Sequence, residues 1–134
     1  MTAGRVQYSD DLISRRKQVT VGVDLKRTRE AMSAWKWAYE THRVDEPSFG
    51  DWVNALLRTR LAEVQPTAPT EGRQPRMYWI DRDLLADLDA AGENRSAVFR
   101  GLIDLGAAEL EEMARRDGEE IPQVKRLPNK VYRS

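Results

Sequence analysis

The stretch RKQVTVGVD, Arg16–Asp24, decides the fold. Every second residue from Val19 to Val23 is a valine, and the residues on the other face are polar or small: Gln18, Thr20 and Gly22. Alternation with a period of two residues is typical of a strand that is buried on one face only. A single strand leaves backbone N–H and C=O groups unpaired, so this stretch requires a second strand beside it.

Two helical patterns follow the strand. Asp24 stands where a helix N-cap is expected, and apolar side chains then recur in steps of three and four as far as Tyr39. Ser48 and Asp51 resemble a capping box at the start of a second helix. The second helix carries one apolar stripe: Trp52, Val53, Leu56 and Leu57. We therefore predict two amphipathic helices that pack on the valine face of the strand.

The same order of elements then returns after a linker. QPTAPTEGRQP (residues 65–75) contains three prolines and one glycine, a linker composition. RMYWI (76–80) is a second β-prone run, Asp81 stands as a helix cap, and Asn94 stands as the cap of a last helix. The hexapeptides WVNALL (52–57) and VFRGLI (98–103) share their apolar spacing.

The chain thus divides into five parts by composition and pattern. We expect a flexible N-terminal arm, a first strand–helix–helix unit, the linker, a second such unit and an extended basic tail: residues 1–15, 16–64, 65–75, 76–117 and 118–134. This is an internal repeat of architecture. The predicted fold class is mainly α with short β.

Composition narrows the function. The 134 residues include 22 basic and 22 acidic side chains and no cysteine, and no apolar run is long enough to span a bilayer. We therefore expect a cytoplasmic protein without membrane contact. There is no nucleophile elbow, glycine-rich phosphate loop or paired histidines, so we expect no enzyme activity, no cofactor and no metal.

The zero net charge conceals an uneven distribution. Residues 1–36 contain eight basic and four acidic side chains, whereas residues 81–93 contain one basic and five acidic side chains. Contacts to an anionic partner such as a phosphate backbone are therefore expected in the first half of the chain. The N-termini of the two second helices, near Ser48 and Asn94, are further candidate phosphate sites because their first N–H groups lack helical partners.

Three stretches resemble the ribbon-helix-helix family of DNA-binding proteins: QVTVGVDL (18–25), SFGDWVNALL (48–57) and WIDRDLLADLDAAGENRSAVFRGLIDLG (79–106). The first unit departs from the family pattern through its long, tryptophan-bearing first helix and its proline-containing turn. The resemblance implies two tandem ribbon-helix-helix units whose strands pair as antiparallel two-stranded ribbons. It also implies similarity to repressors and to partition or relaxosome accessory proteins of plasmids.

In that family the ribbon enters the major groove of double-stranded DNA, and its outward side chains read bases. The resemblance assigns base reading to Gln18, Thr20 and Gly22. Phosphate contacts fall to the basic residues around the strand start and to the helix N-termini: Arg15, Arg16, Lys17, Ser48, Asn94, Arg95 and Ser96. The expected function is sequence-specific binding by a homodimer or higher oligomer, for transcriptional repression or for plasmid or chromosome partition. Such a protein would be nucleoid-associated, and its arm could contact a partition ATPase.

The role of the second strand stays open. Its pattern points Tyr78 and Ile80 inward and Met77 and Trp79 outward, and neither outward side chain is a good hydrogen-bonding base reader. It either pairs with the first strand inside one chain, as in the tandem accessory proteins of conjugative plasmids, or serves oligomerisation while the first strand reads DNA. We favour the second arrangement. The outward Met77 and Trp79 also leave an alternative function, a protein-interaction adaptor that does not read DNA.

Overall fold

The computed structural model describes residues 15–68, 73–92 and 94–126. The strands and helices follow in the order β1 (Arg16–Asp24), α2 (Leu25–Glu40), α3 (Phe49–Arg60), β2 (Arg73–Asp81), α4 (Leu85–Ala90) and α5 (Arg95–Arg116), with 3₁₀ turns at Leu61–Glu63 and Arg82–Leu84. The protein is mainly helical with one two-stranded antiparallel sheet. Within the described part of the chain, no helix is both long and apolar enough to cross a membrane.

The two strands pair with each other along their whole length. Thr20 lies opposite Met77 at the centre of the ribbon, Gln18 lies opposite Trp79, and Asp24 lies opposite Arg73. The arrangement that we favoured from the sequence, in which the strands belong to separate ribbons, is therefore wrong. The predicted start of the second strand at residue 76 is three residues late, because Arg73–Pro75 extend the pairing to the end of β1.

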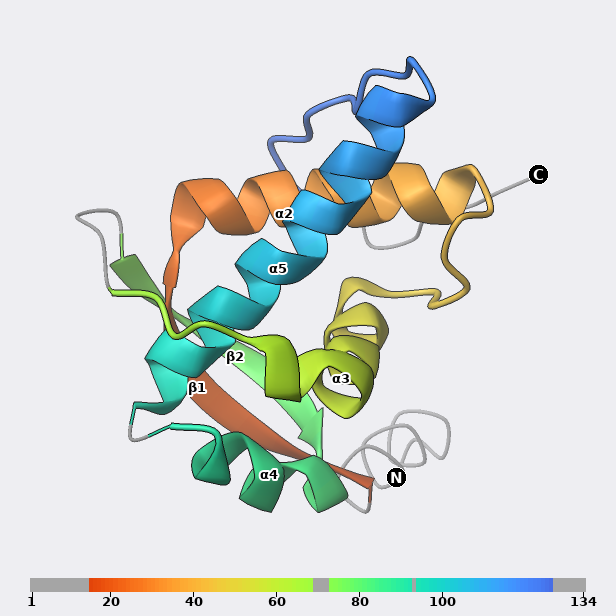
Figure 1. The fold of residues 1–134 in the computed structure, drawn as a ribbon. Helices are drawn as coiled ribbons and strands as arrows, with labels where there is room; N and C mark the ends of the chain where they lie inside the picture. Colours follow the sequence, from red (N-terminus) through yellow and green to blue (C-terminus); the bar gives the residue numbers. More distant parts are fainter. Residues whose placement is uncertain (1–14, 69–72, 93, 127–134) are drawn as a thin grey trace, which may run out of the picture.

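The core lies on one face of this ribbon. The valines of β1 and Tyr78 and Ile80 of β2 are buried there, as predicted. Helix α5 packs against β1 and runs on across α2, and α3 packs against β2 (Figure 1). Trp35 and Trp52 are core residues, in agreement with their helical spacing. None of the helices in the described residues packs on the other face of the ribbon, where Gln18, Thr20 and Met77 are exposed.

Side-chain caps begin three of the helices, as predicted. Asp24 accepts a hydrogen bond from the N–H of Arg27, Ser48 accepts one from Asp51, and Asn94 accepts one from Ala97. Asp81 makes no such cap, which corrects the prediction for the second unit. Its carboxylate binds two arginines instead, and the chain enters α4 through the 3₁₀ turn.

Helices α3 and α5 approach closely at a glycine. A Cβ added to Gly106 would lie 2.5 Å from Leu56 Cδ1 and 2.9 Å from the ring of Trp52, so a larger residue at this crossing would displace these side chains. After α5 the chain turns back along α2 without regular secondary structure, and the N–H of Val124 donates to Ser33 Oγ at 2.9 Å. Of the predicted tail, residues 127–134 lie outside the described part, as does the predicted arm apart from Arg15.

Candidate nucleic-acid interface

The outer face of the ribbon carries the predicted reading residues. We define it by the side chains that point away from the core: Gln18, Thr20, Gly22, Pro75, Met77 and Trp79. Gln18 and Thr20 are exposed, and Met77 is the most exposed large apolar side chain of the described residues, at 61%. The predicted orientation of both strands is therefore confirmed. β1 contributes polar side chains to this face, and β2 contributes apolar side chains.

Arg73 adds a cation that the sequence did not assign to this face. A Cβ added to Gly22 would lie 2.9 Å from Arg73 Cδ and 3.4 Å from its Nε, so the arginine stem lies against the glycine. Gly22, to which the resemblance assigned base reading, thus makes room for the side chain of Arg73. Arg73 itself is exposed and lies opposite Asp24, at the end of the outer face beyond Gly22.

Two buried polar side chains hold the ribbon from the core side. Asn54 Nδ2 donates to Trp79 O at 2.9 Å, and Asn54 Oδ1 accepts from the N–H of Asp81 at 2.8 Å. Arg100 Nη1 donates to Gly22 O at 2.7 Å. Asn54 and Arg100 occupy the same position in WVNALL and VFRGLI, and each binds the backbone of the strand from the opposite unit. The two hexapeptides therefore place their polar residues in equivalent contacts with the ribbon.

Arg100 makes this contact at an energetic cost. It is only 5% exposed, its Nε donates to Thr67 O at 3.0 Å, and its Nη2 has no hydrogen-bond partner. Burial lowers the pKa of the Arg100 guanidinium, and the nearby positive charge of Arg73 lowers that pKa further. A buried charge held only by carbonyl groups is less stable than one paired with a carboxylate. Arg100 therefore binds the carbonyl groups of Gly22 and Thr67, while its positive charge is not paired with a carboxylate.

Arg16 is occupied by carboxylates at one end of the ribbon. Its Nε donates to Asp81 at 2.7 Å and its Nη2 donates to Asp51 at 2.8 Å, and the side chain is 13% exposed. Asp81 also accepts from Arg58, whose contacts with Asp83 hold the pKa of the Asp83 carboxyl below its usual value. Arg16 therefore ties β1 to α3 and to the end of β2. A phosphate contact by Arg16 would require it to exchange these partners.

The other predicted phosphate residues divide into two groups. Ser48 and Asn94 cap their own helices, Arg95 binds Asp89 at 2.8 Å, and Ser96 Oγ accepts from the N–H of Gly22 at 2.9 Å. Lys17 is exposed, and within the described residues no carboxylate pairs with it. Arg15 is exposed as well but has an interaction of its own. Lys17 is thus the predicted phosphate residue whose charge is most available.

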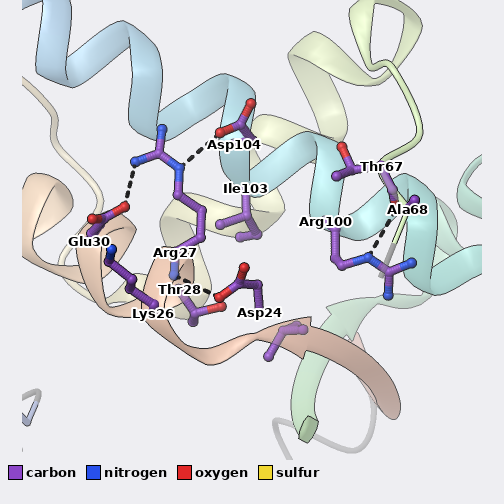
Figure 2. Close-up of a pocket in the computed structure, with 11 residues that line it drawn as sticks. Asp24, Lys26, Arg27, Thr28, Glu30, Thr67, Ala68, Arg100, Ile103 and Asp104 are labelled. Atoms are coloured by element: carbon purple, nitrogen blue, oxygen red, sulfur yellow. Dashed lines mark hydrogen bonds and ion pairs between the residues drawn. The ribbon is translucent and has the colours of Figure 1, made fainter. Parts of the chain in front are cut away.

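A cavity of about 340 Å³ lies beside the end of β1, between the first turn of α2, helix α5 and the linker residues Thr67 and Ala68 (Figure 2). Arg27 spans its opening and binds Asp104 at 2.8 Å and Glu30 at 3.0 Å. Arg27, one of the three cations that line the cavity, is therefore already paired with carboxylates, whereas Arg100 donates only to the carbonyl groups of Thr67 and Gly22. No group of three metal-binding side chains occurs among residues 15–68, 73–92 and 94–126. The outer face of the ribbon remains the candidate site.

Comparison of the chain with protein-family models, with curated proteins and with solved structures gives no match, so the candidate site rests on its own geometry.

Proposed function

We propose that this chain binds double-stranded DNA in the manner of ribbon-helix-helix proteins, with the outer face of the β1–β2 ribbon in the major groove. One observation carries the proposal: the two strands form a single antiparallel ribbon that exposes Gln18 and Thr20 on one face and is covered by helices on the other. The major groove of B-DNA admits a two-stranded ribbon, and its base edges present a distinct pattern for each base pair.

The side chains of the outer face have the chemistry for this task. Gln18 can bond adenine through two atoms, Thr20 can contact a base edge or a thymine methyl group, and Arg73 can bond guanine or a phosphate. Met77 offers an apolar contact to a thymine methyl group. Lys17 adds a phosphate contact, and the start of α5, where no acidic side chain lies in the first turn, adds a second one.

The decisive experiment replaces the two polar side chains proposed to contact bases, Gln18 and Thr20, in one variant. Bound sequences are first selected from a random duplex pool, and binding is then measured for Gln18→Ala/Thr20→Ala and for the matched control Thr59→Ala, an exposed threonine on α3. Each good base contact contributes about 1–3 kcal/mol of discrimination, so the double variant should lose roughly tenfold or more of its preference for the selected site. Unchanged preference in the double variant would remove the outer face from the interface.

Salt and charge variants test the backbone contacts. Affinity should fall steeply with ionic strength, and Lys17→Gln should weaken binding to all sequences alike and reduce the salt dependence. The use of such binding, in transcriptional repression or in plasmid or chromosome partition, is part of the proposal. So are assembly into a homodimer or higher oligomer, nucleoid association and contact with a partition ATPase.

The exposed Met77 beside Trp79 favours a second candidate, a protein-interaction adaptor that uses the same face. Exposed apolar side chains on a sheet are frequent in protein interfaces. Gel shifts at low salt and sedimentation of wild type and Met77→Lys separate the two candidates. No duplex binding, together with self-association that Met77→Lys abolishes, would favour the adaptor. Duplex binding by a non-associating wild type would exclude it.

A further inference from the structure

A second pocket, which we call the basic pocket, lies between α2, β2 and the segment that follows α5. It has a volume of about 290 Å³, and four of its lining residues are cations: Arg29, Arg76, Lys125 and Arg126. None of its lining residues carries a carboxylate. The volume is just below the range of about 300–1,000 Å³ that is typical of small-molecule sites. The pocket therefore concentrates positive charge in a concave site of ligand size.

The cations of the basic pocket have no counter-ions in the part of the chain that the structure describes. Across the residues that the structure describes, no carboxylate pairs with Arg29, Arg76, Lys125 or Arg126. Arg76 is half-buried, its Nε has no hydrogen-bond partner, and its Cζ lies 5.4 Å from the ring centre of Tyr78. Like charges in one pocket repel each other, so binding of an anion would stabilise the arrangement. Guanidinium groups suit phosphate and carboxylate because they donate two parallel hydrogen bonds.

The pocket also has an apolar wall. Leu25 and Met32 of α2 and Val124 of the final segment line it beside the cations. The wall is held in place, because the N–H of Val124 is bonded to Ser33 Oγ and Ile121 packs against the core. An inorganic anion would leave this wall in contact with water. A ligand with a charged group and a small apolar group would use both parts of the pocket.

We propose that the basic pocket binds a small phosphate monoester, with its phosphate among the four cations and its apolar group against Leu25, Met32 and Val124. The pocket is not a continuation of the DNA interface. Arg76 lies opposite Val21 and shares the core side of β2 with Tyr78 and Ile80, whereas the proposed base-reading side chains, Gln18 and Thr20, are on the other side of the ribbon. The inference does not depend on the proposed function.

Titration calorimetry of the full chain, without DNA, tests the site. Phenyl phosphate serves as the monoester, and inorganic phosphate and benzoate are the other two probes. Phenyl phosphate should bind saturably at one site, at least about tenfold more tightly than inorganic phosphate because burial of a phenyl ring adds apolar stabilisation. Equal binding of inorganic phosphate would overturn the monoester assignment, and tighter binding of benzoate would overturn the choice of phosphate.

Two matched variants show whether the named cations hold the ligand. Arg126→Gln removes an exposed arginine from the pocket, and Arg116→Gln removes an exposed arginine from the end of α5, outside it. Arg126→Gln should weaken phenyl phosphate binding about tenfold, the effect of one lost charge-assisted contact, and Arg116→Gln should leave it unchanged. Equal binding by both variants, or no saturable binding by wild type, would overturn the inference. Weaker duplex binding by Arg126→Gln without any phosphate binding would assign the cations to DNA instead.

Discussion

Replacement of Asn54 by alanine should loosen β2 from α3. The Asn54 side chain is 3% exposed and makes three hydrogen bonds, two of them to the backbone of β2 at Trp79 and Asp81. Alanine removes the hydrogen-bond partner of the Trp79 carbonyl and of the Asp81 N–H. Each buried polar group that loses its partner costs about 1–3 kcal/mol. Entry of water offsets part of this loss. We therefore expect the free energy of unfolding to fall by about 3 kcal/mol.

Urea unfolding followed by tryptophan fluorescence measures this change. A loss of about 3 kcal/mol corresponds to a midpoint roughly 1–2 M lower, with an unchanged slope, for a protein of this size. Thr59→Ala is the control, because that hydroxyl is exposed and bonds only the carbonyl of Ala55 in its own helix. It should stay within about 0.5 kcal/mol of wild type. If Asn54→Ala stays within the same limit, the amide does not hold β2 and this account of the ribbon is refuted.

Asn54→Asp separates hydrogen bonding from packing at the same site. Aspartate preserves the size of the side chain and can still accept from the N–H of Asp81, but its ionised form cannot donate to Trp79 O. A buried carboxylate without a cation is costly, so this variant should be less stable than Asn54→Ala at neutral pH. Its stability should recover on acidification, when the carboxyl group becomes protonated. If the free energy of unfolding of Asn54→Asp does not rise on acidification, the side chain at position 54 is not buried.

Three further outcomes are expected. Burial raises the pKa of Tyr78 from 10.0 to about 12, so the unfolded chain loses this proton first and the free energy of unfolding should fall between pH 10 and pH 12. The maximal loss is about 3 kcal/mol, and a Tyr78→Phe variant, compared by urea unfolding, should lack it. Gly101→Ala would place a Cβ 2.1 Å from the backbone oxygen of Gln65 and should cost about 1–3 kcal/mol, whereas Gly50→Ala meets only Ser48 Oγ at 3.9 Å and should not destabilise. Arg27→Met removes ion pairs to Glu30, Asp104 and Glu111 at a partly exposed site, so thermal unfolding should show a loss of about 1 kcal/mol that shrinks in high salt.

The local features of the fold were predictable from the sequence. The valine alternation gave the first strand and its buried face, and the residues Asp24, Ser48 and Asn94 gave the starts of three helices. Each of these features depends on neighbours within a few positions of the chain. Apolar and polar or small residues alternate strictly from Gln18 to Val23, and this pattern indicates a strand that is buried on one face. The burial of Trp35 followed in the same way from its place on a helical stripe.

Features that depend on pairing across the chain were not predictable. Arg73 was assigned to the linker because only the register with β1 places it beside Gly22. Asp81 fits a helix cap as well as it fits an ion pair, and the choice depends on Arg16, which is 65 residues away. The sequence did contain a signal for the two buried polar residues that bind the strand backbones. Asn54 and Arg100 are polar residues at equivalent positions of two apolar hexapeptides, a pattern that indicates a buried polar contact.

The pairing of β1 with β2 within one chain has a consequence for behaviour at low concentration. A ribbon shared between two molecules dissociates on dilution, whereas this one forms in a unimolecular step, so the fraction that is assembled does not vary with the amount of protein. Its two halves are also different in sequence, since Gln18 faces Trp79 and Thr20 faces Met77. Each molecule therefore presents a directional surface, and a ligand that contacts both strands has no need of twofold symmetry.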